Sequence, residues 1–153
     1  MRVALYQPDI AGNVGTVLRL GACFDADIDI IEPCGFAFSD RALRRAGMDY
    51  AAFGRHRRHA DWAAFRASVA PDARIVLFTT AGATDLPLAR FEARDVLLFG
   101  SESAGVPADI HALADLRVRI PLAPAARSLN VAVAAGIGLA EALRQTDGFP
   151  RGE

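Results

Sequence analysis

Residues 120–140 read Ile-Pro-Leu-Ala-Pro-Ala-Ala-Arg-Ser-Leu-Asn-Val-Ala-Val-Ala-Ala-Gly-Ile-Gly-Leu-Ala, an extended run that passes through a polar turn into an apolar helix. We expect the strand to stop at Pro121 and the helix to start at Ser128. Parallel α/β proteins build ligand sites at such junctions, because free backbone N–H groups and the positive end of the helix dipole meet there. A helix that is apolar all round must be covered on every side. This segment therefore predicts a ligand loop and a buried helix, which we expect at a contact between subunits.

The rest of the chain alternates short apolar runs with helical stretches. Such a pattern indicates an α/β fold, with a mainly parallel sheet and helices on both of its faces. We expect one domain over residues 1–153. The expected strands are Val3–Gln7, Ile28–Ile31, Ile75–Thr80, Val96–Phe99 and Leu116–Ile120. The expected helices begin near Asn13, cover Arg41–Ala46 and Trp62–Val69, follow Pro107, and begin at Ser128.

The composition is typical of a soluble protein. A hydrophobic share of 52% and a net charge of −1 favour a buried subunit contact and exclude a global basic field for nucleic acid. Cys23 and Cys34 form neither a disulfide framework nor a CxxC site, and the N-terminus lacks the features of a signal peptide. The longest apolar helix, Leu129–Ala140, is shorter than the ~20 residues of a membrane span. We therefore expect a cytoplasmic protein with no membrane association.

A loop that is rich in glycine and polar residues follows the first expected strand. This loop, residues 7–16, together with Glu32 faintly resembles a dinucleotide site, but its glycines occur only as Gly12-x-x-Gly15 and not as G-x-G-x-x-G. Asn13 in this loop is alternatively a helix cap. Arg19 lies six residues into the helix that follows, where an arginine is usually a solvated surface charge.

A second such loop covers residues 98–107. It superficially resembles a serine nucleophile elbow, but Glu102 stands where the G-x-S-x-G pattern needs serine. Gly100 and Gly105 frame Glu102 and indicate a backbone that approaches a ligand closely. The alternative for Glu102 is an ordinary charge at the start of a helix.

One stretch concentrates the basic side chains, all of which in this chain are arginine. We interpret Arg44, Arg45, Arg57 and Arg58 as candidates for contacts with RNA phosphates, and a solvated surface is the alternative. Tyr50 and Phe53 lie between the two clusters as candidate stacking surfaces. In the same stretch His56, His59 and Asp61 lack a fourth ligand at a metal-site spacing, so we expect no metal.

Taken together, the loops resemble one family, the SPOUT-class RNA 2′-O-methyltransferases, and in particular the small tRNA wobble-position branch known as TrmL or YibK-like. The resemblance covers Arg2 to about Gln145, with its motifs in the right order and spacing. The matching segments are Leu5-Tyr6-Gln7-Pro8 through Asn13-x-Gly15 and Arg19; Ile31-Glu32-Pro33-x-Gly35-Phe36; Leu43-Arg44-Arg45-Ala46-Gly47-x-Asp49-Tyr50; Phe99-Gly100-x-Glu102-x-x-Gly105-x-Pro107; and Arg119-Ile120-Pro121 through Arg127-Ser128-x-Asn130.

The resemblance implies a C-terminal trefoil knot, a homodimer, and S-adenosylmethionine (SAM) as the methyl donor. General fold rules do not predict a knot. The implied activity is 2′-O-methylation of the ribose at the wobble nucleotide of tRNA, either cytidine or a carboxymethylaminomethyl-uridine. For the dimer we expect a small-residue surface on the last helix, made by Ala134, Ala135, Gly136, Gly138 and Ala140.

The resemblance also assigns roles to single residues. Arg19 takes the catalytic position, and Asn13, Glu102 and Asn130 take positions that order the loops. The implied SAM pocket holds Phe78, Thr79, Gly100, Ile120, Leu122, Ser128 and Leu129. The chain departs from the family pattern at Val14, Thr16, Ala132 and Ala140.

Two other functions remain open at this stage. One is a SPOUT 2′-O-methyltransferase that acts on ribosomal RNA or on another position of tRNA. The other is a non-catalytic module that binds a dinucleotide or RNA, although the glycine spacing is against the dinucleotide.

Overall fold

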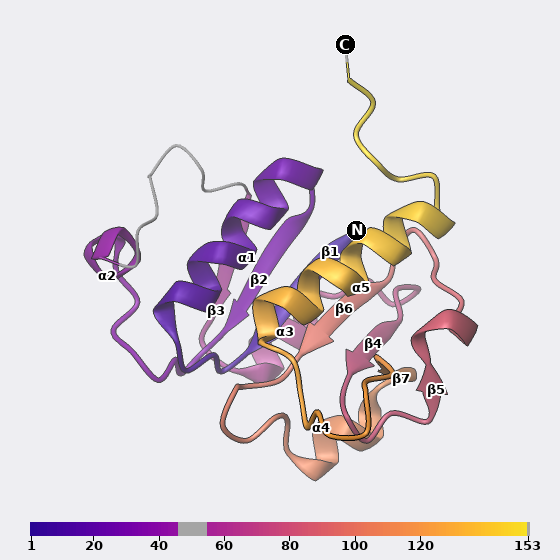
Figure 1. Ribbon diagram of the computed structural model, residues 1–153. Coiled ribbons are helices and arrows are strands. Elements are labelled where there is room, and N and C mark those ends of the chain that lie inside the picture. The colour runs from indigo at the N-terminus through magenta and orange to yellow at the C-terminus, as the bar shows by residue number, and fades with distance from the viewer. Residues whose placement is uncertain (46–54, 153) are drawn as a thin grey trace.

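The computed structural model describes residues 1–45 and 55–152, in which seven strands form a single sheet with all pairs parallel (Figure 1). The order across the sheet is β3-β2-β1-β6-β4-β7-β5. The predicted parallel sheet is therefore confirmed. The strands are β1 (Arg2–Tyr6), β2 (Asp27–Ile31), β3 (His56–His59), β4 (Ile75–Phe78), β5 (Thr84–Asp85), β6 (Val96–Phe99) and β7 (Leu116–Arg119).

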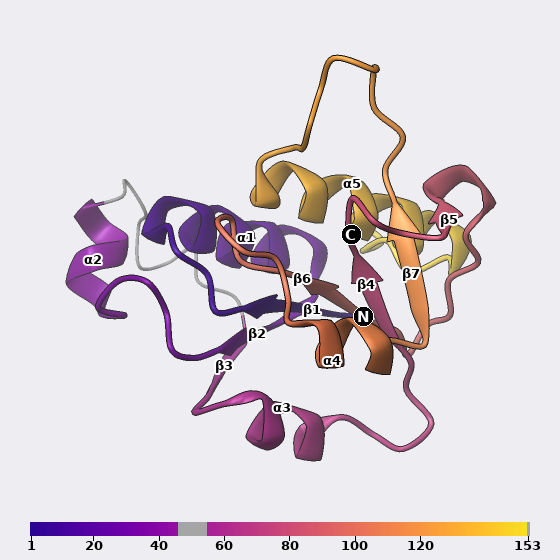
Figure 2. The ribbon, with the colours of Figure 1, turned by 90° about the horizontal axis from the view of Figure 1, so that it is seen from below.

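Helices cover both faces of the sheet, as predicted. Figure 2 shows α1 and α5 on one side of the sheet and α3 and α4 on the other. No helix in the described ranges has the length and apolar character needed to cross a membrane. The helices are α1 (Ala11–Phe24), α2 (Asp40–Arg45), α3 (Trp62–Ser68), the 3₁₀ helix η2 (Leu86–Leu88), α4 (Ala108–Leu113) and α5 (Val131–Gln145).

The central strands are apolar because both of their faces are covered. All four residues of β4 and of β6 are buried. Successive side chains point to opposite faces, so Val76 and Phe78 join the core under α1 and α5, whereas Ile75 and Leu77 join the core under α3 and α4. The two layers of helices therefore share one sheet whose central strands β4 and β6 are short and entirely hydrophobic.

Strand β3 was missed by the sequence interpretation, which treated its residues only as part of a basic stretch. The strand reads His-Arg-Arg-His and pairs with β2 at the edge of the sheet, with His59 opposite Ile31. Only His59 is buried. Charged side chains on an edge strand discourage pairing with another chain, and they leave no apolar alternation from which the strand could be recognised.

Two helix starts differ from the prediction. Helix α1 begins at Ala11 after Ile10, which makes no side-chain cap, so Asn13 lies within the first turn and is not a cap. Helix α5 begins at Val131 rather than Ser128, because Asn130 is its N-cap residue. The Asn130 Oδ1 atom accepts hydrogen bonds from the N–H groups of Ala132 at 2.9 Å and Val133 at 3.3 Å.

Helix α5 is buried on one side only. We had expected the helix to be covered on every side, and this chain alone does not cover it. Its inner side includes Ala135 and Gly138, which we had expected at a dimer contact; that part of the expectation is wrong. A Cβ atom on Gly138 would lie 2.6 Å from Cζ of Phe78. On the outer side Val133 is 50% exposed and Ile137 is 38% exposed.

Candidate active site

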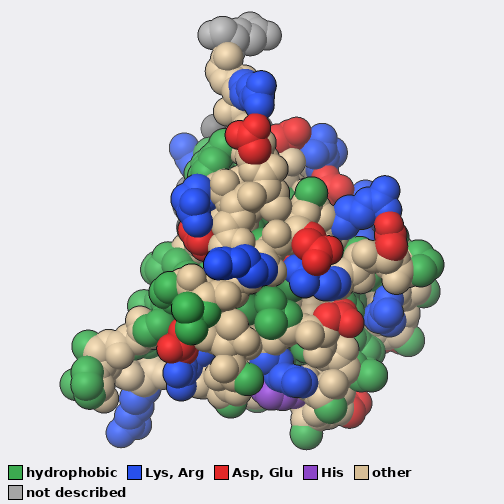
Figure 3. Space-filling view, turned by 90° about the vertical axis from the view of Figure 1, so that its right-hand side faces the viewer, with side chains coloured by type: hydrophobic (Ala, Val, Ile, Leu, Met, Phe, Trp, Pro, Cys, Tyr) green, Lys and Arg blue, Asp and Glu red, His purple; other side chains and the backbone are tan. Residues whose placement is uncertain are grey.

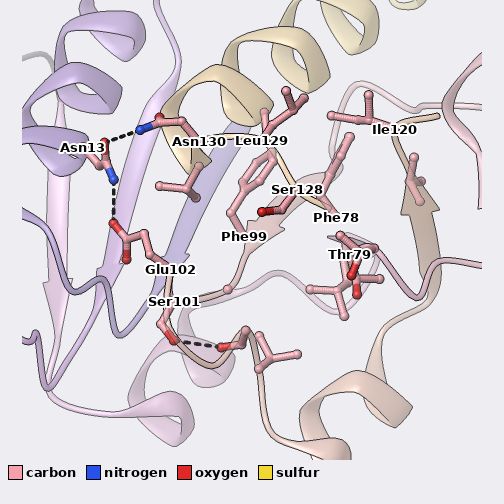
Figure 4. A pocket seen from close by; sticks show the side chains of 18 of the residues that line it. Asn13, Phe78, Thr79, Phe99, Ser101, Glu102, Ile120, Ser128, Leu129 and Asn130 are labelled. Atoms are coloured by element: carbon pink, nitrogen blue, oxygen red, sulfur yellow. Dashed lines mark hydrogen bonds between the residues drawn. The ribbon is translucent and has the colours of Figure 1, made fainter. Parts of the chain in front are cut away.

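The carboxyl ends of β4, β6 and β7 open into a cavity of about 500 Å³, which the N-terminal ends of α1 and α5 also border (Figure 4). This volume lies within the range of small-molecule sites, which occur at this edge of parallel sheets. Every residue that we predicted for the SAM pocket lines the cavity, and Asn13, Glu102 and Asn130 do too. The predicted set is Phe78, Thr79, Gly100, Ile120, Leu122, Ser128 and Leu129.

The floor of the cavity is aromatic. The rings of Phe78 and Phe99 stack with their centroids 4.8 Å apart and their planes at 19°, and Phe91 stacks on Phe78 from farther away, at 6.2 Å. Gly138 on α5 packs directly against the Phe78 ring. Because the rings hold one another, the wall is rigid and apolar and can accept a flat or weakly hydrated group.

Three polar side chains connect the two helices that border the cavity. Glu102 Oε1 accepts a hydrogen bond from Asn13 Nδ2 at 2.9 Å, and Asn13 Oδ1 accepts one from Asn130 Nδ2 at 2.9 Å (Figure 4). Asn130 in turn caps α5. The carboxylate therefore fixes both amides in one orientation and ties the loop after β6 to the start of α5.

The same carboxylate holds the loop after β1. Glu102 Oε2 accepts a hydrogen bond from the Asp9 N–H at 2.8 Å. Asp9 Oδ2 accepts hydrogen bonds from the Ser103 hydroxyl at 2.6 Å and the Ser103 N–H at 3.0 Å, and these bonds lower the pKa of Asp9. Loops that lie more than 90 residues apart in the sequence are thus joined by a reciprocal pair of contacts.

Gly100 and Gly105 let the loop after β6 fold back on itself. Ser101 and Gly105 exchange backbone hydrogen bonds at 3.0 and 2.9 Å, and Gly105 has a φ of +66°. A Cβ atom on Gly100 would lie 2.5 Å from the backbone of Gly105. We expected these glycines to let the backbone approach a ligand; the close approach seen in the structure is instead between two parts of the same loop.

Sequence reasoning did not identify several residues at the cavity. Ile10, Phe99 and Ser101 line it, and Asp9 supports it through Glu102. Phe99 and Ser101 flank Gly100, and Asp9 and Ile10 precede Asn13 in the same loop, so position near a predicted residue was the available signal. None of them belongs to a pattern that by itself points to chemistry.

Arg19 lies apart from the cavity of its own chain. It is exposed on α1, in a stripe with Thr16 and Cys23 at helical spacing. Asn13, on the same helix, lines the cavity, but Arg19 does not. The structure therefore does not bring the predicted catalytic arginine together with the predicted SAM pocket within one subunit.

The four arginines that we interpreted as an RNA patch are exposed and lie on two elements. Arg44 and Arg45 are in the last turn of α2. On β3, Arg57 pairs with Asp27 at 3.4 Å and Arg58 pairs with Glu32 at 2.5 Å. Glu32, the acidic residue of the dinucleotide alternative, is therefore engaged by an arginine and does not line the cavity.

Two other features of the basic stretch can now be placed. Tyr50 and Phe53 lie outside the described residues. His56 is exposed whereas His59 is buried, with its Nε2 2.7 Å from Asp29, and Asp61 caps α3. In residues 1–45 and 55–152 no group of three or more His, Cys, Asp or Glu side chains could hold a metal ion.

Comparison with known proteins identifies the family. A model described as "SpoU rRNA Methylase family" matches residues 1–140. A tRNA (cytidine(34)-2′-O)-methyltransferase of Beijerinckia indica subsp. indica is 54% identical over 144 residues, which are 94% of this chain and 90% of that protein. A structure described by the words "Structural insights into the 2-OH methylation of C/U34 on tRNA" matches with a TM-score of 0.88 and 40% identity over 94% of each chain.

A second solved structure matches over a smaller share of its own length. It is an AdoMet-bound rRNA methyltransferase from Sinorhizobium meliloti, with a TM-score of 0.81 and 34% identity over 94% of this chain and 55% of that one. The resemblance inferred from the loops is thus confirmed, and the chain belongs to the SpoU rRNA methylase family of methyltransferases.

Proposed function

We propose that this protein transfers a methyl group from SAM to the ribose 2′-hydroxyl of nucleotide 34, the wobble position, of tRNA. The observation that carries the proposal is the match, over nearly the full length of both chains, to relatives that are named for this reaction. The rRNA methyltransferase structure, in contrast, is only 55% covered by this chain. The cavity supports the proposal because all the residues predicted for the donor converge on it.

The cavity is chemically suited to SAM. When bound, SAM supplies the methyl group on a cationic sulfonium whose charge disperses during transfer. The stacked rings of Phe78 and Phe99 and the side chain of Leu122 form an apolar wall that favours this loss of charge by excluding water. Glu102, the one carboxylate among the lining residues, is occupied by two hydrogen bonds and holds the loops together.

As its oxygen attacks the methyl carbon, the ribose hydroxyl would release its proton to solvent water. In our proposal Arg19 holds the phosphate beside the target ribose and stabilises the negative charge that develops on the 2′-oxygen. A guanidinium remains protonated in nearly all environments, so it is better suited to this electrostatic role than to that of a base. The need for a 2′-hydroxyl selects RNA over DNA.

We propose that the active unit is a homodimer. The outer face of α5 leaves Val133 and Ile137 exposed, and α1 lies next to α5 (Figure 1). The side that carries β5 and η2 shows hydrophobic side chains mixed with Arg, Asp and Glu (Figure 3). Pairing through α1 and α5 would bring the stripe that carries Arg19 toward the cavity of the other subunit. This arrangement would explain why Arg19 does not line the cavity of its own chain.

We further propose that the whole chain forms one domain whose C-terminal part is tied as a trefoil knot. Two features support the knot. Strand β7 inserts between β4 and β5, which precede it in the sequence, and the loop after β4 packs tightly on β7, where a Cβ on Gly82 would lie 2.6 Å from Arg119 N. A cytoplasmic location, where tRNA is modified, is consistent with the unpaired Cys23 and Cys34.

The Ser128 hydroxyl is expected to contribute to donor binding. Its side chain lies inside the cavity between Phe99 and Thr79 (Figure 4). Ser128→Ala should raise the SAM dissociation constant about fivefold, since a lost hydrogen bond costs about 1 kcal/mol. Isothermal titration calorimetry measures the change. Ser68→Ala, which removes a hydroxyl at the end of α3, serves as the matched control, and an equal loss in both variants would contradict the assignment.

The exposed arginines should contribute to tRNA affinity through charge. If Arg44, Arg45 and Arg57 each contact a phosphate, replacing any one with alanine should lower the slope of log affinity against log salt by about one. SAM affinity should not change. Filter binding at several salt concentrations measures the slopes. A triple alanine variant with the wild-type slope would identify these residues as solvated surface charges.

Nucleoside mass spectrometry tests the proposed function directly. The purified protein is incubated with SAM and tRNA from a strain that lacks the modification. A 2′-O-methylated nucleoside at position 34 is expected. Because the family model is named for rRNA methylation, rRNA is the second substrate to test. Methylation of rRNA alone, or of another tRNA position, would overturn the proposed substrate but not the reaction.

A further inference from the structure

A planar cation lies on an aromatic ring beside the active-site cavity. The guanidinium carbon of Arg58 is 4.4 Å from the centroid of the Phe38 ring, and Phe36 packs against Phe38 at 6.1 Å. One edge of the guanidinium donates a hydrogen bond to Glu32 Oε1 at 2.5 Å. The Arg58 side chain is 43% exposed. The ring below and the carboxylate at the edge therefore hold the guanidinium in one plane, while part of it stays open to solvent.

This arrangement is joined to the cavity by the loop after β2. The Gly35 N–H donates to the Pro8 carbonyl at 2.9 Å, and the N–H of the next residue, Asp9, donates to Glu102. The Cys34 thiol interacts electrostatically with Arg58 and with Glu102, the residues that this loop connects. Burial raises the pKa of this thiol to about 11; the negative charges of Glu32 and Glu102 raise it further, and the positive charge of Arg58 opposes them. Hydrogen bonds thus connect the loop after β2, which carries Phe38, to Glu102 at the cavity.

A fixed plane is more than a phosphate contact requires. A phosphate needs only a positive charge, which Arg57 on the same strand supplies without stacking on a described ring. Unpaired RNA bases, in contrast, stack on flat guanidinium and aromatic groups. Both arginines are paired with a carboxylate, Arg57 with Asp27 and Arg58 with Glu32. What distinguishes Arg58 is therefore its stacking on Phe38 and not its charge.

We infer that the Arg58 guanidinium, supported by Phe38, is a stacking platform for an unpaired base of the anticodon loop other than the nucleotide that is methylated. The inference rests on the proposed function, because it takes tRNA as the substrate. It assigns a recognition role to the loop after β2 and to β3, neither of which contributes a residue to the cavity.

The decisive change is Arg58→Lys, which keeps the charge and removes the plane. In tRNAs that carry 2-aminopurine at one anticodon-loop position at a time, the wild-type protein should quench the fluorescence of one probe. The Lys variant should lose that quenching and bind tRNA about tenfold more weakly, a loss within the range of one stacked base. Its salt slope and SAM affinity should be unchanged. Phe38→Leu should weaken binding similarly, whereas Phe38→Trp should retain it.

Arg94→Lys is the matched control, because Arg94 is also an exposed arginine paired with a carboxylate, that of Asp72. It should bind and quench like the wild type. Wild-type quenching and affinity in Arg58→Lys would overturn the inference, and so would equal losses in the Arg58 and Arg94 variants. A failure of the proposed function appears differently, as a wild-type protein that does not methylate nucleotide 34. Both results can be read independently, since quenching requires only binding.

Discussion

Replacing Arg19 with alanine should lower the rate of methyl transfer by at least about 100-fold, the range that follows loss of one preorganised charge-stabilising group. The SAM dissociation constant should stay nearly the same, because Arg19 does not line the cavity. Arg19→Lys should restore little activity, since an ammonium cannot reproduce the planar fork of a guanidinium. Single-turnover transfer with saturating tRNA and SAM measures the step. Near wild-type transfer by Arg19→Ala would make Arg19 an ordinary surface charge.

Mixed dimers test whether Arg19 serves the cavity of the other subunit. Arg19→Ala subunits are combined with Gly100→Ala subunits. In the second variant the new methyl group would collide with the backbone of Gly105 and distort the loop after β6, which borders the cavity. Neither variant should be active alone. If Arg19 acts across the dimer, a mixed dimer keeps one intact cavity that faces an intact arginine, and activity returns. If Arg19 acts within its own subunit, mixing restores nothing.

Leucine at Gly138 should unfold or strongly destabilise the protein, whereas leucine at Gly136 should not. A Cβ on Gly138 would already lie 2.6 Å from the Phe78 ring, against which Phe99 stacks. Overpacking of this kind costs about 3 kcal/mol, which lowers the melting temperature by roughly 6–12 °C in a domain of this size. A Cβ on Gly136 has no atom within 4 Å. Thermal denaturation of the two variants makes the comparison.

The same pair separates folding from dimerisation. Gly136→Leu should keep the wild-type melting behaviour of the subunit and shift the molecule toward the monomer in light scattering, because Gly136 lies on the outer side of α5 with Val133 and Ile137. A Gly138→Leu protein that melts like the wild type would show that the Phe78 wall is softer than the packing implies. A dimeric Gly136→Leu protein would remove this face of α5 from the proposed interface.

Local patterns in the sequence were enough to predict the central strands and the loop before α5. The strands at Ile75–Phe78 and Val96–Phe99 are apolar runs between turn residues, so their composition alone predicts that they are buried. The loop before α5 was recognisable because a proline, a polar turn and a helix start follow one another. The resemblance of the motifs then identified the methyltransferase family, because several short motifs in one order and spacing are more specific than any single residue.

Other features were decided only by the tertiary structure. Strand β3 has no apolar alternation and is a strand because the exposed edge of β2 supplies its hydrogen bonds. Asn13 looks like a cap in sequence, but Glu102 and Asn130 turn it into a bridge between loops that are 89 and 117 residues away. The position of Arg19 outside its own cavity also depends on how α1 packs. Periodicity reports which side of an element is buried, whereas the partner it meets there is set by packing between distant segments.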